Sequence, residues 1–379
     1  MVRSVPASIA IVVMLSFAAA ADAQMFKDMR GSDGALDMSD YLAKKGAFLP
    51  VPILITEPAV GYGGGLGALF FHGGNPLSKT ERDAGMRAIP PSISVGAAFF
   101  TENGSKGGLI AHFGVFKQDH IRYIGAFGGA ALNLDYWGTS GKPRPDPLRY
   151  DVSGALTFHR LLFRVRDTPL FVGGEASYST QNMEFKPQLL PPDTPPREVD
   201  QQDAGVGIIS EYETLNNIFT PTTGMKFRVL GKTFSKNLGG DNDRQTLDVE
   251  AFGFLPVQER LIVGLRSDLG FSDGDTPFYL LPYVNLRGLP ALKYTGKHIA
   301  STELELRFSV TGRWSAVAFG GLGFVSDKPA NLLNADAIGT KGAGFRYLIA
   351  ERLGIHMGID YAKGPDDGAI YIIVGSAWR

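Results

Sequence analysis

The sequence predicts an all-β fold, a transmembrane antiparallel β-barrel of about sixteen strands, on three observations. Apolar and charged residues alternate with a period of two over many short segments. The 48 glycines and 25 phenylalanines suit strands and tight turns, and the absence of cysteine rules out disulfides and thiolate metal sites. Beyond residue 23, no apolar run is long enough to form a transmembrane helix.

The first 23 residues have the pattern of a cleavable signal peptide. Arg3 precedes an apolar run, and Ala21-Asp22-Ala23 matches a small-residue cleavage site. We therefore expect export and a mature chain that starts at Gln24. An uncleaved anchor helix is the alternative, but the run is shorter than the roughly 20 apolar residues that a membrane span needs. Residues 24–48 are expected to form a short periplasmic segment, and residues 49–379 the outer-membrane barrel.

The alternation that predicts the strands is clear in residues 301–310. One face of this segment is apolar and consists of Leu304, Leu306, Phe308 and Val310. The other face is charged and consists of Glu303, Glu305 and Arg307. Both signs of charge oppose an apolar face in several segments, which favours a polar lumen inside a lipid-facing wall over a soluble sandwich.

Segments of this kind number sixteen, an even number, as closure of an antiparallel barrel requires. The predicted strands are residues 49–57, 61–72, 92–101, 106–116, 120–136, 148–163, 170–181, 202–212, 224–234, 245–255, 261–271, 300–310, 314–324, 341–350, 353–361 and 369–378. Long connections are expected outside and short turns inside. The long connection at 73–91 and the short one at 103–105 break this rule, so a miscount of one early strand stays open.

Six motifs in order along residues 49–379 resemble the bacterial surface antigen barrel, the membrane domain of outer-membrane assembly factors and two-partner secretion transporters. They are PAVGYGGGLGALFF (58–71), NNIFTPTTG (216–224), NLRGLP (285–290), ELELRFSV (303–310), VAFGGLGFV (317–325) and GFRYLIAERLGIHMGIDYA (344–362). The resemblance implies a sixteen-stranded barrel in the bacterial outer membrane, with a strained seam between the first and last strands. Its partners would be membrane lipid and a polypeptide client or periplasmic partner protein.

The resemblance also implies that the long sixth outer loop folds into the lumen and docks an arginine on acidic residues. Arg287 would be this loop-tip cation, and Gly288 the residue of its tight turn. A guanidinium inside a barrel needs carboxylate partners, and the candidates are Glu303, Glu305 and Asp360. From spacing alone, Arg287 is more simply interpreted as an exposed loop arginine.

Two positions depart from the family pattern. Leu289 replaces the usual aromatic residue of the loop tip, and Gly321 stands where the family usually has an aspartate. We therefore expect the docking to be weaker or to be rebuilt on the carboxylates named above. At the C-terminus, Tyr371, Gly375 and Trp378 are the candidate assembly signal of the last strand, although Trp378 stands one place before the chain end.

The sequence predicts no enzyme and no catalytic, metal or cofactor site. The glycines of residues 61–67 lack the Lys-Ser/Thr of a phosphate loop, and no G-x-S-x-G or H-E-x-x-H pattern occurs. A lipid-facing hydrolase would need a serine beside a base, and no such Ser–His pairing is evident. The net charge of −1 provides no broad basic field for nucleic acid. We expect a monomer.

Two functions stay open. The first is an assembly-type barrel that helps to insert or translocate polypeptides or lipids together with a partner. Its difficulty is that relatives handling polypeptides carry periplasmic polypeptide-transport-associated (POTRA) domains, and residues 24–47 are too few for one. The second is a passive pore or structural barrel whose lumen charges set its conductance.

Overall fold

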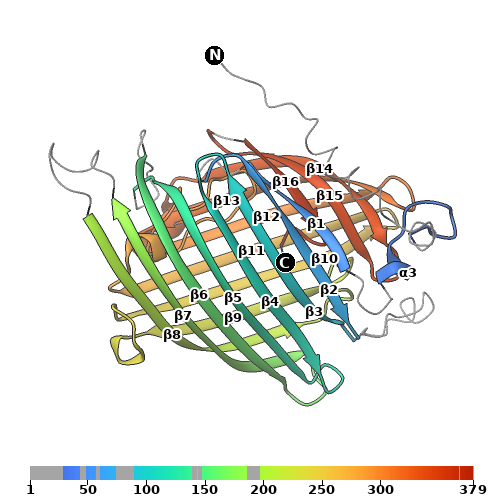
Figure 1. The fold of residues 1–379 in the computed structure, drawn as a ribbon. Coiled ribbons are helices and arrows are strands. Elements are labelled where there is room, and N and C mark those ends of the chain that lie inside the picture. Colours follow the sequence, from blue (N-terminus) through green and yellow to red (C-terminus); the bar gives the residue numbers. More distant parts are fainter. Residues whose placement is uncertain are drawn as a thin grey trace.

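The computed structural model describes residues 29–42, 48–56, 60–73, 89–138, 143, 147–185, 197–366 and 368–378. In this part of the chain, sixteen antiparallel strands form one sheet in chain order and curl into a barrel (Figure 1). The predicted fold class and strand count are therefore confirmed. The expected signal peptide, residues 1–23, lies outside the described residues.

The strands alternate in direction around the wall. They are β1 Phe48–Ile55, β2 Gly63–His72, β3 Ser92–Thr101, β4 Lys106–Phe116, β5 Ile121–Tyr136, β6 Leu148–Arg164, β7 Leu170–Phe185, β8 Arg197–Glu213, β9 Gly224–Phe234, β10 Arg244–Gln258, β11 Leu261–Gly274, β12 His298–Ser309, β13 Trp314–Ser326, β14 Ile338–Ala350, β15 Ile355–Lys363 and β16 Gly368–Val374. The helices are α3 Ser39–Leu42 and the short 3-10 helices η3 Lys236–Leu238, η4 Phe278–Leu280 and η5 Pro329–Asn334. Among the described residues, no helix combines the length and hydropathy needed to cross a membrane.

Several strands extend beyond the predicted bounds at the end of the barrel that carries the β7–β8 and β11–β12 connections, which we call the loop end. In β7 and β8 the ladder continues through polar residues, and Asn182 Nδ2 donates to Asp200 Oδ1 across it at 2.8 Å. Apolar alternation stops earlier than backbone pairing, because pairing does not require an apolar face. We call the opposite end, with the β4–β5, β12–β13 and β14–β15 turns, the turn end.

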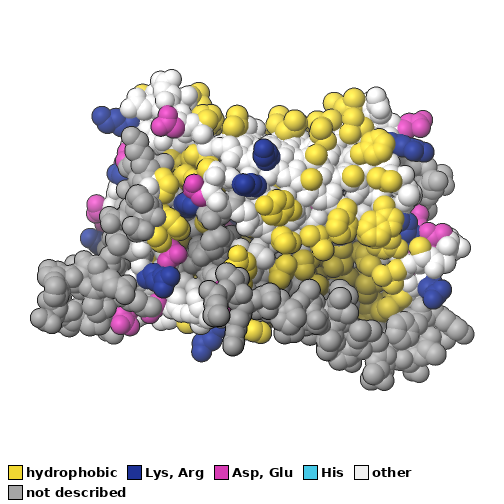
Figure 2. Space-filling model, turned by 90° about the horizontal axis from the view of Figure 1, so that it is seen from above, with side chains coloured by type: hydrophobic (Ala, Val, Ile, Leu, Met, Phe, Trp, Pro, Cys, Tyr) yellow, Lys and Arg dark blue, Asp and Glu magenta, His cyan; other side chains and the backbone are white. Residues whose placement is uncertain are grey.

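The two faces of the wall differ as the alternation predicts. On β12, Glu303 and Glu305 are buried on the inner face, whereas Leu304 and Leu306 are 45% and 40% exposed on the outer face. Figure 2 shows hydrophobic side chains over much of one outer face, with acidic side chains near the two ends. Exposed apolar residues on a wall with a charged interior are the pattern of a barrel that faces lipid.

The N-terminal segment 29–42 packs against the turn end. Met38 and Leu42 are buried in an apolar cluster with Leu49 of β1 and Ile355 of β15. In Figure 1, α3 lies beside the ends of the last strands. The segment thus has a defined place on the barrel, although it was expected only to be short.

Arg313, in the β12–β13 turn, holds this segment by ion pairs. Its Nε lies 2.6 Å from Asp33 Oδ2, and its Nη1 lies 2.9 Å from Asp37 Oδ2. The hydrogen bond from Arg313 lowers the pKa of Asp33. Burial raises the pKa of Asp37, but hydrogen bonds from Ser39 and Arg313 outweigh it, so that this pKa is also lowered.

Replacing Arg313 with alanine is expected to release the segment 29–42, which limited proteolysis in detergent would detect as faster cleavage there. Arg352→Ala is the matched control, because its ion pair with Asp40 is exposed and contributes little. Because docking lowers the pKa values of Asp33 and Asp37, their ionised carboxylates stabilise the docked segment above pH 3.8. This stabilisation is lost as the pH falls through the lowered pKa values. Equal cleavage in wild type and Arg313→Ala at neutral pH would contradict this role.

Candidate functional site

The candidate site is the inner face of the barrel where the β11–β12 connection, residues 275–297, meets the wall. Val284, Leu286, Leu289 and Tyr294 of this connection are buried in one cluster with wall residues Ile299, Val325 and Ile338. The connection folds back on itself, since Val284 N donates to Tyr294 O at 3.0 Å and Leu289 N to Leu286 O at 3.1 Å. Its tip therefore lies among wall residues and is not exposed at the barrel end.

Two glycines of β13 allow this close approach. A Cβ on Gly323 would lie 2.3 Å from Val284 Cγ1, and one on Gly321 would lie 3.0 Å from Leu286 Cδ2. Gly321 is the position where the family pattern has an aspartate. Here an apolar side chain of the connection occupies that space, which gives the departure a packing reason.

Arg287 sits at the tip, 9% exposed, and meets all three carboxylates proposed from the sequence. Its Nη2 lies 2.7 Å from Glu303 Oε1 and 2.9 Å from Glu305 Oε2, and its Nη1 lies 2.7 Å from Asp360 Oδ2. The guanidinium carbon also lies 3.5 Å from the centroid of the Phe319 ring. The geometry excludes the exposed-loop interpretation of Arg287.

A second arginine balances the charge of this cluster. Arg346 of β14 donates from Nη2 to Asp360 Oδ2 at 2.8 Å, and Asp360 is fully buried. Arg307 of β12 is also buried and donates from Nη2 to the carbonyl of Pro221. Three carboxylates and three guanidinium groups therefore share this region. Buried charges are tolerated only when they are paired and hydrogen-bonded in this way.

The loop tip also contacts the last strand. Gly288 has φ +93°, a conformation that favours glycine, and its N–H donates to Tyr371 Oη of β16 at 2.9 Å. A Cβ on Gly288 would lie 2.9 Å from the backbone of Lys363. The tip thus bridges β12 and the neighbouring pair β15 and β16, which lie apart from β12 in the sheet.

The end of the chain differs from the prediction. β16 ends at Val374 and not at Trp378, because Gly375 takes φ +80° and turns the backbone away from the sheet. Trp378 is 6% exposed, stacks on Phe254 with ring centroids 5.1 Å apart, and donates from Nε1 to Glu303 Oε1 at 2.6 Å. The predicted last strand, residues 369–378, is therefore too long at its C-terminal end, and Trp378 lies inside the barrel.

The β8–β9 connection, which contains the NNIFTPTTG motif, packs against β15 and the C-terminal segment at the turn end. Asn217 Nδ2 donates to Leu353 O at 2.9 Å, and a Cβ on Gly375 would lie 2.8 Å from Phe219 O. Thr220 Oγ1 accepts a hydrogen bond from His356 N at 3.2 Å. The motif thus supports the inward turn of the chain end.

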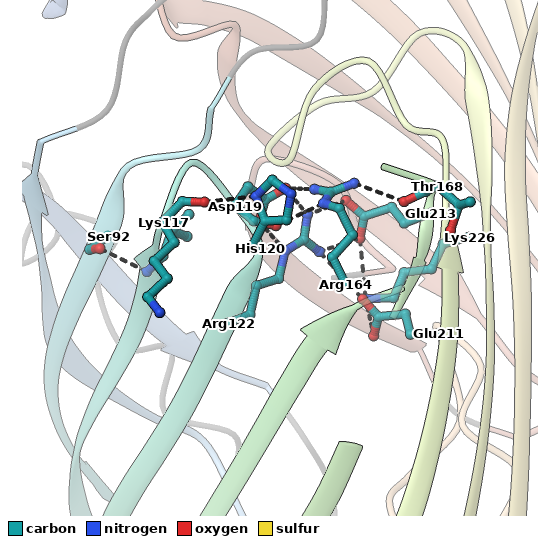
Figure 3. Close-up of polar contacts among 11 residues, drawn as sticks. Ser92, Lys117, Asp119, His120, Arg122, Arg164, Thr168, Glu211, Glu213 and Lys226 are labelled. Atoms are coloured by element: carbon teal, nitrogen blue, oxygen red, sulfur yellow. Dashed lines mark hydrogen bonds and ion pairs between the residues drawn. The ribbon is translucent and has the colours of Figure 1, made fainter. Parts of the chain in front are cut away.

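A second buried charge network lies at the turn end between β5 and β9 (Figure 3). Arg122 donates from Nε to Asp119 Oδ1 at 2.6 Å and from Nη1 to Glu213 Oε2 at 3.2 Å. Lys226 Nζ lies 2.9 Å from Glu211 Oε2. Sequence reasoning missed this network, because its members come from different strands and become neighbours only through the register. The network links β5, β8 and β9 at the turn end.

The seam between β1 and β16 lacks a backbone ladder in the described residues, although both strands pair on their other side. The link across it is a side chain: Thr56 Oγ1 donates to Ile370 O at 2.9 Å and accepts from Ile370 N at 2.8 Å. Pro50 and Pro52 of β1 lack an N–H. A proline inside a paired strand is tolerated where its nitrogen faces away from the partner, so both face the seam. This edge signal was readable in the sequence and was missed.

No family model and no curated protein matches the sequence of this chain. Among solved structures, BamA from Haemophilus ducreyi lacking POTRA domains 1–3 has a TM-score of 0.52 at 14% identity, over 93% of this chain and 80% of that chain. The chain has the barrel fold of BamA. CdiB from Escherichia coli has a TM-score of 0.54 at 13% identity, and CdiB from Acinetobacter baumannii one of 0.52 at 9% identity.

Each match to CdiB covers 86% of this chain but only 61% and 59% of the two CdiB chains. The likeness to BamA and CdiB concerns the barrel, and at these identities it establishes the shared fold. The BamA-like fold agrees with the fold that the motif resemblance implied.

Arg287→Ala is expected to destabilise the barrel by about 3–5 kcal/mol, because three buried carboxylates lose a shared cation. The measurement is the midpoint of denaturant unfolding in detergent, followed by heat-modifiable migration. Arg149→Ala is the control, since the Arg149 side chain is 73% exposed in its ion pair with Asp135. An equal, small shift in both variants would contradict the stabilising role of Arg287.

Gly323→Ala is expected to cost about 1–3 kcal/mol by overpacking against Val284. The second substitution Val284→Ala removes the clashing methyl groups and should restore part of the loss. A double-mutant cycle on unfolding midpoints measures this coupling. Additive effects of the two substitutions would show that the connection does not pack against β13 in this way.

Proposed function

We propose that this chain is a bacterial outer-membrane barrel of the assembly type that admits polypeptide or lipid clients at the β1–β16 seam. The observation that carries the proposal is the seam itself, which is bridged by Thr56 and Ile370 and by no backbone ladder in the described residues. Exported proteins with an apolar outer wall and charged interior belong in that membrane.

Opening such a seam breaks few hydrogen bonds, although Leu49 of β1 would also have to part from Val374 of β16 in the apolar cluster at the turn end. Each backbone hydrogen bond contributes about 0.5–1.5 kcal/mol, so a full ladder along β16 would resist separation far more than one threonine side chain does. The unpaired edges that opening exposes can pair with an incoming strand. Pro50 and Pro52 reduce the donors that β1 offers to β16, which keeps the seam weak.

In this proposal the loop tip is a latch. Arg287 is anchored on β12 and β15, and Gly288 hydrogen-bonds Tyr371 of β16. Trp378 shares Glu303 with Arg287, so the chain end is held to the same cluster. If β16 moved away from β1, these contacts would either break or move together with β16.

A partner protein would supply client capture. The described N-terminal segment 29–42 is packed on the turn end and offers only the short helix α3. We therefore propose that a periplasmic partner delivers the client to the seam.

The second candidate function is a passive pore. A cavity of about 430 Å³ lies on the inner face, lined by charged residues of both signs that include Arg228, Glu250, Arg266 and Asp268. Arg228 pairs with Glu250 and Arg266 with Asp268, each at 2.9 Å, so the lining is polar but largely paired. A polar lining favours a water-filled lumen. In a passive pore, however, the seam would have no role.

Locking the seam tests the proposal. The chain has no cysteine, so Thr56→Cys with Ile370→Cys supplies two unique thiols for a short reducible crosslinker. We expect the crosslink to abolish any acceleration of insertion of an unfolded barrel client into liposomes, and reductant to restore it. The control pair is Ser267→Cys with Thr302→Cys, whose hydroxyls lie 3.2 Å apart on the paired strands β11 and β12. Full activity with a locked seam would refute the proposal.

Planar-bilayer recording separates the two functions. If the tip is a latch, Arg287→Ala should raise the frequency of open events over the wild type, because the tip loses its anchors on β12 and β15. A large, steady conductance that is the same in both proteins would instead favour the passive pore.

A further inference from the structure

The outer face of β2 to β6 carries a group of polar side chains that the proposed function does not use. The sheet register places Ser94 opposite Phe70 and His112, His112 opposite Gly125, and Gly125 opposite His159. Residues opposite one another point to the same face. Phe70 is 37% exposed on the outside of the wall, so this whole row faces outward.

These side chains form two hydrogen-bonded sets. Ser94 Oγ lies 2.9 Å from His72 Nε2 and 2.9 Å from His112 Nδ1. Tyr123 Oη lies 2.8 Å from His159 Nδ1, and Thr157 Oγ1 lies 3.1 Å from His159 Nε2. The expectation that no Ser–His pairing faces lipid is thus wrong. The pairing was missed because its members lie on three strands and meet only through the register.

A cavity of about 460 Å³ is lined by Ser94 and His112 of the first set and by all three residues of the second. Glycines open it: a Cβ on Gly96 would meet nothing within 4 Å, and Gly125 lies between the two sets in the row. Its apolar frame is Phe70, Ile110 and Phe127. The lining contains histidine, serine, threonine and tyrosine but no carboxylate, so it suits an anionic or ester-bearing group.

Polar, ionisable groups on a lipid-facing surface are costly, and they usually mark a site. Ile110 and Phe127, on the same face, are 64% and 58% exposed, so the surroundings are apolar. The Ser94 hydroxyl is within hydrogen-bond distance of one nitrogen of each ring, which leaves the other nitrogen of each ring for another partner. The free Nε2 of His112, a cavity residue, has no hydrogen-bond partner among the described residues.

We propose that this cavity binds one phospholipid molecule of the surrounding membrane, with its phosphate on the Nε2 of His112 and its acyl chains along Phe70, Ile110 and Phe127. His112 lies four residues from the turn end of β4, which is about 10 Å along the membrane normal for a tilted strand. Turn ends of such barrels face the periplasm, so the polar group lies near the headgroup level of that leaflet.

Binding accounts for the geometry better than hydrolysis of the lipid does. A serine nucleophile needs a base oriented by a third group and donors for the oxyanion. Ser94 lies between two histidines with no carboxylate behind them in the described residues, and nearby strand N–H groups are engaged in the ladders. The site therefore has the parts of a headgroup site and lacks those of an acyl hydrolase.

Native mass spectrometry of the delipidated full chain tests the site with dioctanoyl phosphatidylglycerol as the probe. We expect one retained phosphatidylglycerol, and no retention of dioctanoylglycerol, which lacks the phosphate. Gly96→Leu fills the cavity, and His112→Leu removes a phosphate partner, so each should reduce retention about tenfold. Gly231→Leu is the matched control, an outward glycine of β9 opposite Ile208 with open space around it.

Four outcomes would overturn the proposal. They are unchanged retention in folded Gly96→Leu, equal retention of dioctanoylglycerol, displacement of the lipid by equimolar inorganic phosphate, and release of octanoate that stops in Ser94→Ala. The third would assign the site to free phosphate and the fourth to hydrolysis. Heat-modifiable migration verifies folding, and Ser94→Ala replaces His112→Leu in the retention assay if the latter does not fold. Because the site lies on the outer face, its failure leaves the seam proposal intact.

Discussion

The ion pairs of Arg287 with Glu303, Glu305 and Asp360 are the interaction on which the interior of this barrel depends. Carboxylates withdrawn from water repel one another, and a guanidinium that meets all three converts this repulsion into a link between distant strands. Once the tip is fixed, the apolar side chains beside it, such as Leu286, pack on the glycines of β13. Charge pairing and apolar packing therefore hold the same loop tip.

The wall is held together differently from the interior. Most of its strength is in backbone ladders between neighbouring strands, yet the first and last strands are joined by the side chain of Thr56. The loop tip contacts β16 through Tyr371 on the inside, near a boundary that the ladder leaves weak. Contacts from the lumen therefore add to the few hydrogen bonds that join the two strands.

Local pattern predicted the wall well, because a period of two is visible within each strand and sixteen repeats leave little ambiguity. The cluster around Arg287 was predicted from a family resemblance together with the need of a buried cation for carboxylates. The inward turn at Gly375 and the Ser94 pairing with two histidines were not predicted. Trp378 and Phe254 are far apart in the sequence but stack in the fold. Ser94 contacts His72 and His112 only because the register of three strands brings them together. No single segment contains that information.

The buried position of Trp378 has a practical consequence for work with this protein. A peptide appended to the C-terminus would start one residue beyond an indole that is 6% exposed and hydrogen-bonded to Glu303. Such a tag could disturb the stack of the indole on Phe254 and its hydrogen bond to Glu303. Epitopes and affinity handles therefore belong in a connection at the loop end, for example near the exposed Leu333 of η5.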